Sequence, residues 1–189
     1  MSTSDAITGS ALRLFYHQGF HATGVEQLSQ EAGVTKKTLY RHFPSKEHLV
    51  EAALALRHNE FMAKVNAAVE QAPPALRPEA YLDFIGAWVQ EPDFHGCAFI
   101  NASAEYASLT LAPHILAKRH KQALVAYLEQ ICAQAHLNNP RLAAMQLLLI
   151  GEGLIVSSQV NGVCRELIAA GKEMAVSYTH LRAHETCAD

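Results

Sequence analysis

The chain lacks the features that mark several large classes of protein. Only 17% of its 189 residues are charged and the net charge is −3, so it is not a uniformly basic nucleic-acid coat, and affinity for a polyanion has to come from a local patch. No Gly-rich phosphate loop, Ser-His-Asp order or paired-carboxylate motif is found. The four cysteines form no CxxC pair, which predicts reduced thiols in a cytoplasm rather than a disulfide framework. We expect no cofactor.

Long hydrophobic runs are also missing. The first residues, MSTSDAITG, contain neither a basic nor an apolar region, so we expect no signal peptide. The longest apolar stretch, around residues 147–156, contains Glu152 and two glycines and is shorter than a bilayer requires. Half of the residues are apolar, which is enough for a sizeable core. These features predict a cytoplasmic protein without a membrane partner.

Helical periodicity is present from end to end, without strand alternation. A first helix is predicted around Ile7 to Phe15, ending near Gly19, and a long helix at 46–69 is followed by a break at 71–78 that holds three prolines. Further helices are predicted from Pro78, at 97–106, at 113–135, at 140–159 and from about Cys164. The predicted fold class is therefore all-α.

Residues 23–49 predict two short helices joined by a tight turn and followed by a capped third helix. Thr23, followed three residues later by Glu26, has the form of a capping box, in which the threonine hydroxyl accepts the glutamate amide. Gly33 stands where a helix commonly ends in the left-handed conformation. Thr35 is the expected N-cap of the second helix. This is the sequence form of a helix-turn-helix.

Basic side chains gather on the second helix of this motif. Leu39 and Phe43 share its apolar face, whereas Lys37 and Arg41, four residues apart, point the opposite way. The plain alternative is a solvated basic face on an ordinary helix. Because the caps, the glycine and the basic face agree in register, the pattern favours a surface that docks in a DNA major groove.

The same segment resembles the tetracycline-repressor-like (TetR) family of bacterial transcriptional regulators. The resemblance covers roughly the first quarter of the chain and is carried by Ala11, Leu14, Phe15, Gly19, Phe20, Thr23, Val25, Ala32, Gly33, Val34, Thr38, Leu39, Tyr40, His42, Phe43, Ser45, Lys46 and Leu49. The segment GCAFINASAEYAS, residues 96–108, looks similar to one subgroup of the family but indicates no ligand.

The resemblance implies an N-terminal three-helix helix-turn-helix DNA-binding domain and a C-terminal helical domain for ligand binding and dimerisation. The expected protein is a ligand-responsive repressor, released from a near-palindromic operator by a small apolar or amphipathic molecule. The alternative class is an enzyme or carrier on a helical scaffold, which has no need for a basic face between two capped turns.

Residue roles follow from the resemblance. It implies contacts to DNA base edges from Lys36, Lys37, Thr38 and Tyr40, and contacts to the DNA backbone from Thr23, Arg41, His42 and Lys46. Lysine at the first two positions of the helix suggests guanine N7 and O6 as targets.

A set of polar and aromatic side chains in the second part of the chain gives a plausible lining for an effector pocket. It consists of Phe84, Trp88, Phe99, Asn101, Glu105, Tyr106, His120 and Tyr127. Glu105 and His120 lie on apolar stretches, so they are either hydrogen-bonded core groups or polar groups of that pocket. His95 and Cys97 offer two soft metal ligands, but without a second pair they are expected to be loop residues, and no metal site is predicted.

The helix at 141–160 is apolar almost all round, so it is expected to be buried on two sides. The second side is expected to meet another subunit, giving a homodimer through this helix and the last one; the alternative is a central helix of a monomeric bundle. Gly151 and Gly153 would let a partner helix approach closely.

The chain is divided at the sequence level into three segments. Residues 1–49 are the expected DNA-binding domain, 50–175 the ligand-binding and dimerisation domain, and 176–189 a non-native tail. The segment VSYTHLRAHET within that tail resembles a translated sequencing adapter, and the alternative is a genuine polar extension. His180, His184 and Cys187 are therefore left out of the candidate sites.

Overall fold

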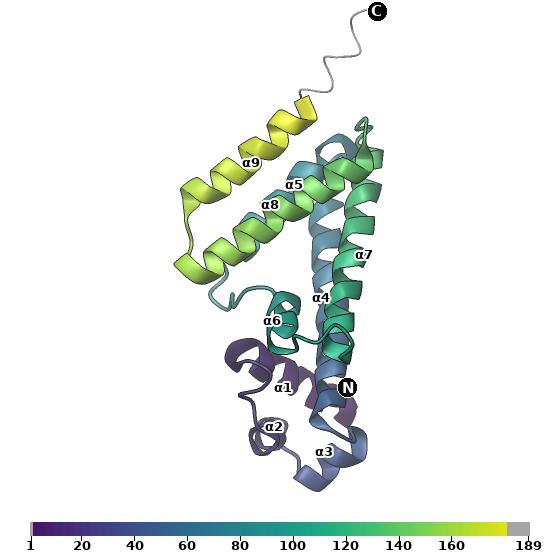
Figure 1. Cartoon of the computed structure of the whole chain (residues 1–189), viewed down its shortest axis with the longest axis vertical. Coiled ribbons are helices and arrows are strands. Elements are labelled where there is room, and N and C mark those ends of the chain that lie inside the picture. Colours follow the sequence, from purple (N-terminus) through teal and green to yellow (C-terminus); the bar gives the residue numbers. More distant parts are fainter. Residues whose placement is uncertain (1, 181–189) are drawn as a thin grey trace, which may run out of the picture. The chain divides into compact units, whose positions relative to one another are not determined.

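The computed structural model describes residues 2–180, together with the side chains of residues 2–175. Every regular element in this part of the chain is a helix, which confirms the all-α prediction. The helices are α1 (Thr3–Gln18), α2 (Val25–Glu31), α3 (Lys36–His42), α4 (Lys46–Val69), the short 3-10 helix η1 (Pro74–Leu76), α5 (Arg77–Trp88), α6 (Ala98–Glu105), α7 (Ala112–Gln134), α8 (Pro140–Asn161) and α9 (Arg165–His180) (Figure 1).

The described residues divide into two compact units. The first holds residues 2–61 and 97–120, and the second holds residues 62–96 and 121–180. Helices α4 and α7 each begin in the first unit and end in the second. The predicted domain boundary at residue 49 is a division by function, and it stays a prediction.

The first unit contains the helix-turn-helix. Helix α1 begins at a capping box in which the Ser2 hydroxyl accepts the Asp5 amide and the Asp5 carboxylate accepts the Ser2 amide. It packs against α2, and α2 packs against α3. The shared core is apolar and fully buried, and it includes Ile7, Ala11, Phe15, Phe20, Leu28, Leu39 and Leu49. Hydrophobic burial of these side chains therefore fixes the three short helices, which could not hold their shape alone.

One local prediction in this unit is wrong. Gly24, not Thr23, is the N-cap of α2, and it makes no side-chain cap hydrogen bond. The Thr23 hydroxyl instead donates to the Gly19 carbonyl at 2.7 Å, and Glu26 pairs with Lys36. A threonine hydroxyl can bond forwards to an amide or backwards to a carbonyl, and here the backward bond is the one formed.

The second unit is built on three mutually packed helices, α5, α8 and α9. Tyr81, Leu82, Ile85 and Trp88 of α5 are buried, as is Val89 directly after it. A Cβ at Gly151 of α8 would lie 2.8 Å from the Tyr81 hydroxyl of α5, so the glycine permits a close approach within the chain rather than by a partner helix. Gly153 has no neighbour within 4 Å of such a Cβ among the described residues.

Helix α8 has two different apolar sides. One side is buried in the second unit and includes Ala144, Leu147, Leu154 and Ile155. The polar residue in this stretch, Glu152, pairs with Lys121 of α7 at 2.8 Å. By length and composition α8 alone, of the helices in the described chain, could cross a membrane, with a mean hydropathy of 1.4; core helices of soluble proteins pass the same test.

The segment predicted to be non-native, residues 176–189, falls largely outside the described residues. The backbone of α9 continues to His180, while His184 and Cys187 lie beyond the described part. The prediction that this segment is non-native therefore stays a prediction. Of the described cysteines, Cys97 and Cys132 are buried and Cys164 is exposed.

Candidate nucleic-acid interface

Helix α3 is held in place by groups that leave its outer face open. Gly33 has φ +64°, the left-handed conformation expected at the end of α2. The Thr35 hydroxyl accepts the Thr38 amide at 3.1 Å and caps α3, as predicted. Leu39 is completely buried and Phe43 nearly so, which confirms both as the apolar anchor. The helix is thus fixed at its start and along its inner side.

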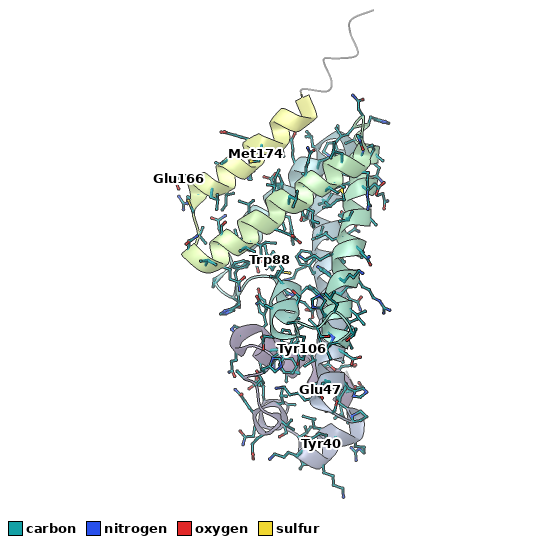
Figure 2. All side chains as sticks on the ribbon, in the orientation of Figure 1. Tyr40, Glu47, Trp88, Tyr106, Glu166 and Met174 are labelled. Carbon is teal, nitrogen blue, oxygen red and sulfur yellow. The ribbon has the colours of Figure 1, made fainter. Side chains whose placement is uncertain are left out.

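The outer face of α3 is cationic and exposed. Lys37, Tyr40, Arg41 and His42 are all exposed, and Tyr40 lies at the surface of this helix (Figure 2). Among the residues that the structure describes, Lys37 and Arg41 have no ion-pair partner. Two uncompensated cations four residues apart on one helix face form a local positive patch on a protein whose net charge is negative.

Lys36 differs from its neighbour in having an acidic partner. Its Nζ lies 2.8 Å from the Glu26 carboxylate of α2, and both side chains are more than half exposed. Exposed pairs of this kind contribute little to stability, about 0–1 kcal/mol. Lys36 can therefore exchange this carboxylate for another acceptor at small cost.

Two of the residues predicted to contact the DNA backbone are engaged with the turn between α1 and α2. Thr23 is fully buried, with its hydroxyl on the Gly19 carbonyl. Lys46, the first residue of α4, is partly buried and donates from Nζ to the His21 carbonyl at 3.3 Å. Their predicted contacts with DNA stay predictions.

The residues of the predicted effector pocket are divided between the two units. Phe99, Asn101, Glu105, Tyr106 and His120 belong to the first, and Phe84, Trp88 and Tyr127 belong to the second. Within the first unit His120 is buried, its ring stacks on Phe99 with centroids 3.7 Å apart, and its Nδ1 lies 2.9 Å from Nδ1 of His58. His120 is thus a hydrogen-bonded core group in this structure.

Glu105, the last residue of α6, makes contacts that the sequence does not indicate. Its carboxylate accepts the Phe20 amide at 2.9 Å and the His21 amide at 2.7 Å. From the sequence, Glu105 was predicted to be either a hydrogen-bonded core group or a polar group of the effector pocket. Its partners are 84 and 85 residues away along the chain, so no local pattern could have identified them.

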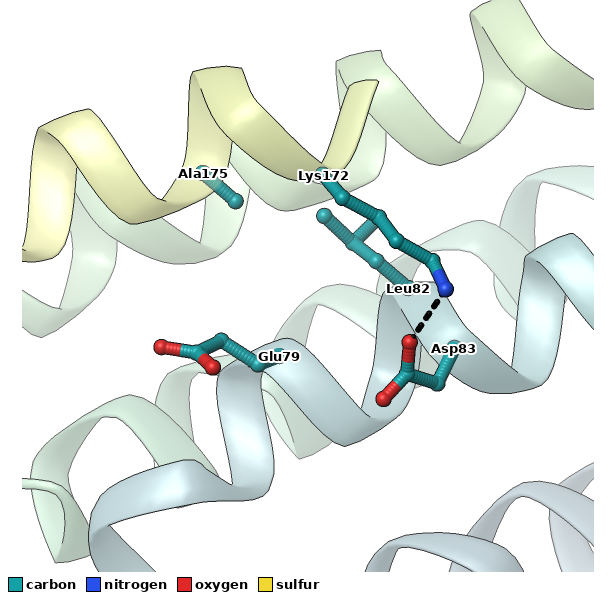
Figure 3. A pocket seen from close by; sticks show the side chains of 5 residues that line it. All are labelled: Glu79, Leu82, Asp83, Lys172 and Ala175. Atoms are coloured by element: carbon teal, nitrogen blue, oxygen red, sulfur yellow. Dashed lines mark ion pairs between the residues drawn. The ribbon is translucent and has the colours of Figure 1, made fainter. Parts of the chain in front are cut away.

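In the second unit, the Tyr127 hydroxyl is buried, and no described residue hydrogen-bonds to it. Burial raises the pKa of Tyr127, so the hydroxyl stays protonated. A separate cavity of about 170 Å³ opens between α5 and α9 and is lined by Glu79, Leu82, Asp83, Lys172 and Ala175 (Figure 3). None of the predicted pocket residues lines that cavity. No group of three or more metal-ligating side chains occurs among the described residues.

A capped helix with an exposed cationic face, joined to the helix before it by a tight turn, defines a helix-turn-helix. Residues 7–53 match the family model of the bacterial regulatory proteins of the tetR family. This N-terminal part of the chain is therefore similar to the TetR family of transcriptional regulators.

Individual relatives agree with this assignment. The HTH-type transcriptional regulator RutR of Escherichia coli K12 is 38% identical over 77 residues, which are 41% of this chain and 36% of that protein. The sequence match thus spans only about a third of the length of such curated relatives.

Structural similarity extends over the whole fold. A TetR-family transcriptional regulator from Streptomyces coelicolor is 26% identical, covers 96% of both chains and has a TM-score of 0.87. The structure of AibR in complex with isovaleryl coenzyme A and operator DNA is 22% identical, covers 92% of this chain and 97% of its own, and has a TM-score of 0.66. The predicted family and fold are confirmed.

Proposed function

We propose that this protein is a transcriptional regulator that binds duplex DNA by inserting α3 into the major groove. The observation that carries the proposal is the exposed, unpaired charge of Lys37 and Arg41 on a helix whose start and inner side are fixed. A helix of this kind brings its own positive charge to the phosphates and its side chains to the base edges. Neither α3 nor its cap needs to rearrange for this docking.

The proposed contacts are of two kinds. Base edges are assigned to Lys36, Lys37, Thr38 and Tyr40, with Lys36 leaving Glu26 for an acceptor on the DNA. Backbone contacts are assigned to Thr23, Arg41, His42 and Lys46. Because the Thr23 hydroxyl is buried, the proposed contact of Thr23 with DNA is through its main chain.

We further propose that the protein acts as a homodimer through α8 and α9. Besides its buried side, α8 exposes Leu142, Met145, Leu149, Val156 and Val160, which recur at helical spacing on one face. In α9, Leu167 is exposed as well, and so is Met174 (Figure 2). A symmetric dimer would cover this apolar face and present two copies of α3 to successive major grooves, about 34 Å apart on a near-palindromic site.

Repression relieved by an effector is the proposed mode of regulation. The buried Tyr127 hydroxyl supports this proposal, because an unsatisfied polar group costs free energy that a ligand with a polar atom would recover. Structures of the fold include AibR with both a coenzyme A thioester and operator DNA. The effector proposed here is a small apolar or amphipathic molecule, and the site of action is the cytoplasm.

An effector can act only if it has unequal affinity for the states that bind DNA and those that do not. The usual coupling is about 1–3 kcal/mol, a loss of roughly 5- to 150-fold in DNA affinity. Reciprocity requires DNA to weaken effector binding by the same factor, and calorimetry with and without operator measures it. Equal effector affinity in both titrations contradicts the allosteric mechanism for that molecule.

A gel-shift assay with the DNA that flanks the gene tests the proposed function. The wild-type protein is expected to shift a discrete fragment in the presence of competitor DNA. The double variant Lys37→Ala, Arg41→Ala is expected to lose that shift while remaining folded, because both residues are exposed. A wild-type protein that shifts flanking and unrelated DNA equally, or neither, contradicts the proposal.

A further inference from the structure

The turn between α1 and α2, residues 19–24, is held by a carboxylate from a distant part of the first unit. Glu105 at the end of α6 accepts hydrogen bonds from the main-chain N–H groups of Phe20 and His21, at 2.9 and 2.7 Å. Its second oxygen also lies 3.0 Å from Nδ1 of the His21 ring. Two consecutive amides and a ring nitrogen therefore converge on one anionic side chain, as in the anion-binding nests of other loops.

The conformation of the turn is adapted to this carboxylate. Gly19 has φ +90°, a conformation that other residues rarely adopt. A Cβ at this position would lie 3.0 Å from Oε1 of Glu105, closer than such contacts normally are. Glycine therefore permits both the backbone conformation and the close approach of the carboxylate.

Other groups hold the remaining polar atoms of the turn. The Thr23 hydroxyl donates to the Gly19 carbonyl, and Lys46 at the start of α4 donates to the His21 carbonyl. The ring of Tyr106 packs against His21, with centroids 4.6 Å apart. Glu105 thus supplies the anionic part of a network that joins α6, the turn and the start of α4.

The carboxylate is charged when it makes these contacts. Partial burial alone would raise the pKa of Glu105, but the hydrogen bonds from the His21 and Phe20 amides and from the His21 ring together lower it. Hydrogen bonds to an ionised acceptor are about twice as strong as those between neutral groups. The contact therefore persists throughout the neutral pH range.

We propose that Glu105 is a positioning residue for DNA binding, fixing through the turn the place where α2 begins and hence the orientation of α3. The inference rests on the proposed DNA-binding function but assigns Glu105 no contact with DNA. Helix α2 packs between α1 and α3, so a change in the turn moves both helices of the motif. Because Glu105 ends α6, a movement of α6 would reach the motif through the same hydrogen bonds.

The variant Glu105→Gln tests the inference with minimal change in volume. It removes the charge and places an amide NH2 against one of the two backbone donors. Glu31→Gln is the matched control, since Glu31 belongs to the same unit and only forms an exposed ion pair with Arg13 at 3.3 Å. Both variants are compared with wild type at a temperature well below every unfolding midpoint, so that unfolding does not contribute.

Two readouts are measured. In amide hydrogen exchange, the Phe20 and His21 amides are expected to exchange about tenfold faster in Glu105→Gln than in wild type. In Glu31→Gln their exchange rates are expected to be unchanged. In DNA titrations, the affinity of Glu105→Gln is expected to fall about tenfold without a change in the dependence on salt concentration, because no phosphate contact is lost. A second variant, His21→Ala, keeps both main-chain hydrogen bonds and is expected to lose less affinity than Glu105→Gln.

The outcomes separate this inference from the proposed function. If folded Glu105→Gln binds DNA as tightly as wild type, Glu105 only stabilises the unit and the inference is overturned while the proposed function stands. Unchanged exchange of Phe20 and His21 overturns it as well. If wild-type protein binds no DNA, the proposed function itself fails, and the inference with it.

Discussion

Helices α3 and α8 each expose one face to solvent, but the two faces differ in chemistry. Seven residues form α3, whose outer side carries Lys37 and Arg41, whereas the 22-residue α8 exposes Leu149 and Val160 at 68% and 74%. Charges attract a partner through water and are weakened by salt, while apolar side chains gain free energy only where they leave water. The difference supports the proposals that α3 binds a polyanion and that α8 packs against a second apolar surface.

Placing a charge on the exposed side of α8 should have the largest effect. In Leu149→Glu, two-fold symmetry brings like charges into one apolar interface, which costs several kcal/mol in protein complexes. We expect the dimer dissociation constant to rise at least roughly 100-fold, about 2.8 kcal/mol. Sedimentation velocity over a concentration series measures it.

Leu109→Glu is the matched control for that experiment. Leu109 is 75% exposed, in the first unit and outside every helix, so its substitution should leave self-association unchanged. If Leu149→Glu dimerises like wild type, or if both variants lose the dimer, the apolar face of α8 is not the interface.

Lys37→Ala tests the cationic side of the comparison. Loss of a base-edge contact should cost about 1–3 kcal/mol and relax the sequence preference at one position of each half-site. Binding to a panel of single-position DNA variants measures both effects, with Lys118→Ala of α7 as an exposed-lysine control. A uniform loss of affinity on all sequences would mean that Lys37 contacts phosphate instead.

The sequence was sufficient for elements whose determinants are local. Thr35 is the N-cap of α3 and α4 spans residues 46–69, both as predicted. The backward hydrogen bond of Thr23 could not be foreseen, because a hydroxyl between two short helices has an amide and a carbonyl within equal reach. Whether it caps or bonds backwards depends on how the turn is folded.

Contacts between residues that are distant along the chain could not be predicted from the sequence, for a different reason. The hydrophobic pattern placed Glu105 and His120 on buried faces, but it carries no information about which polar partner faces them. Their partners, the turn at residues 20–21 and His58, are brought near only by tertiary packing. The exposed apolar face of α8 could be anticipated, since periodicity alone shows that its apolar residues surround the helix.

Thr35→Ala should have a smaller effect, on the framework of α3. Because Thr35, and not Thr23, is an N-cap in this motif, its loss should lower the free energy of unfolding by about 1 kcal/mol. Chemical denaturation followed by circular dichroism measures the change. Thr35→Ser retains the hydroxyl and should unfold like wild type; equal stability of Thr35→Ala and wild type would contradict the capping role.

Lys46→Ala should have the smallest effect on affinity and the clearest effect on its salt dependence. If Lys46 leaves the His21 carbonyl for a phosphate on DNA, the slope of log affinity against log salt should fall by about 1. Lys64→Ala, an exposed lysine farther along α4, should leave the slope unchanged. A lower affinity with an unchanged slope would instead assign Lys46 to holding the turn, as Glu105 does.

The most direct test of DNA binding by a dimer is a footprint of the wild-type protein on the DNA flanking its gene. The structure predicts protection of two half-sites related by a dyad, with centres about 34 Å or one helical turn apart, each sensitive to Lys37→Ala. Protection without dyad symmetry, or protection that Lys37→Ala leaves intact, would contradict the account of α3 as the DNA-contacting helix of a symmetric dimer.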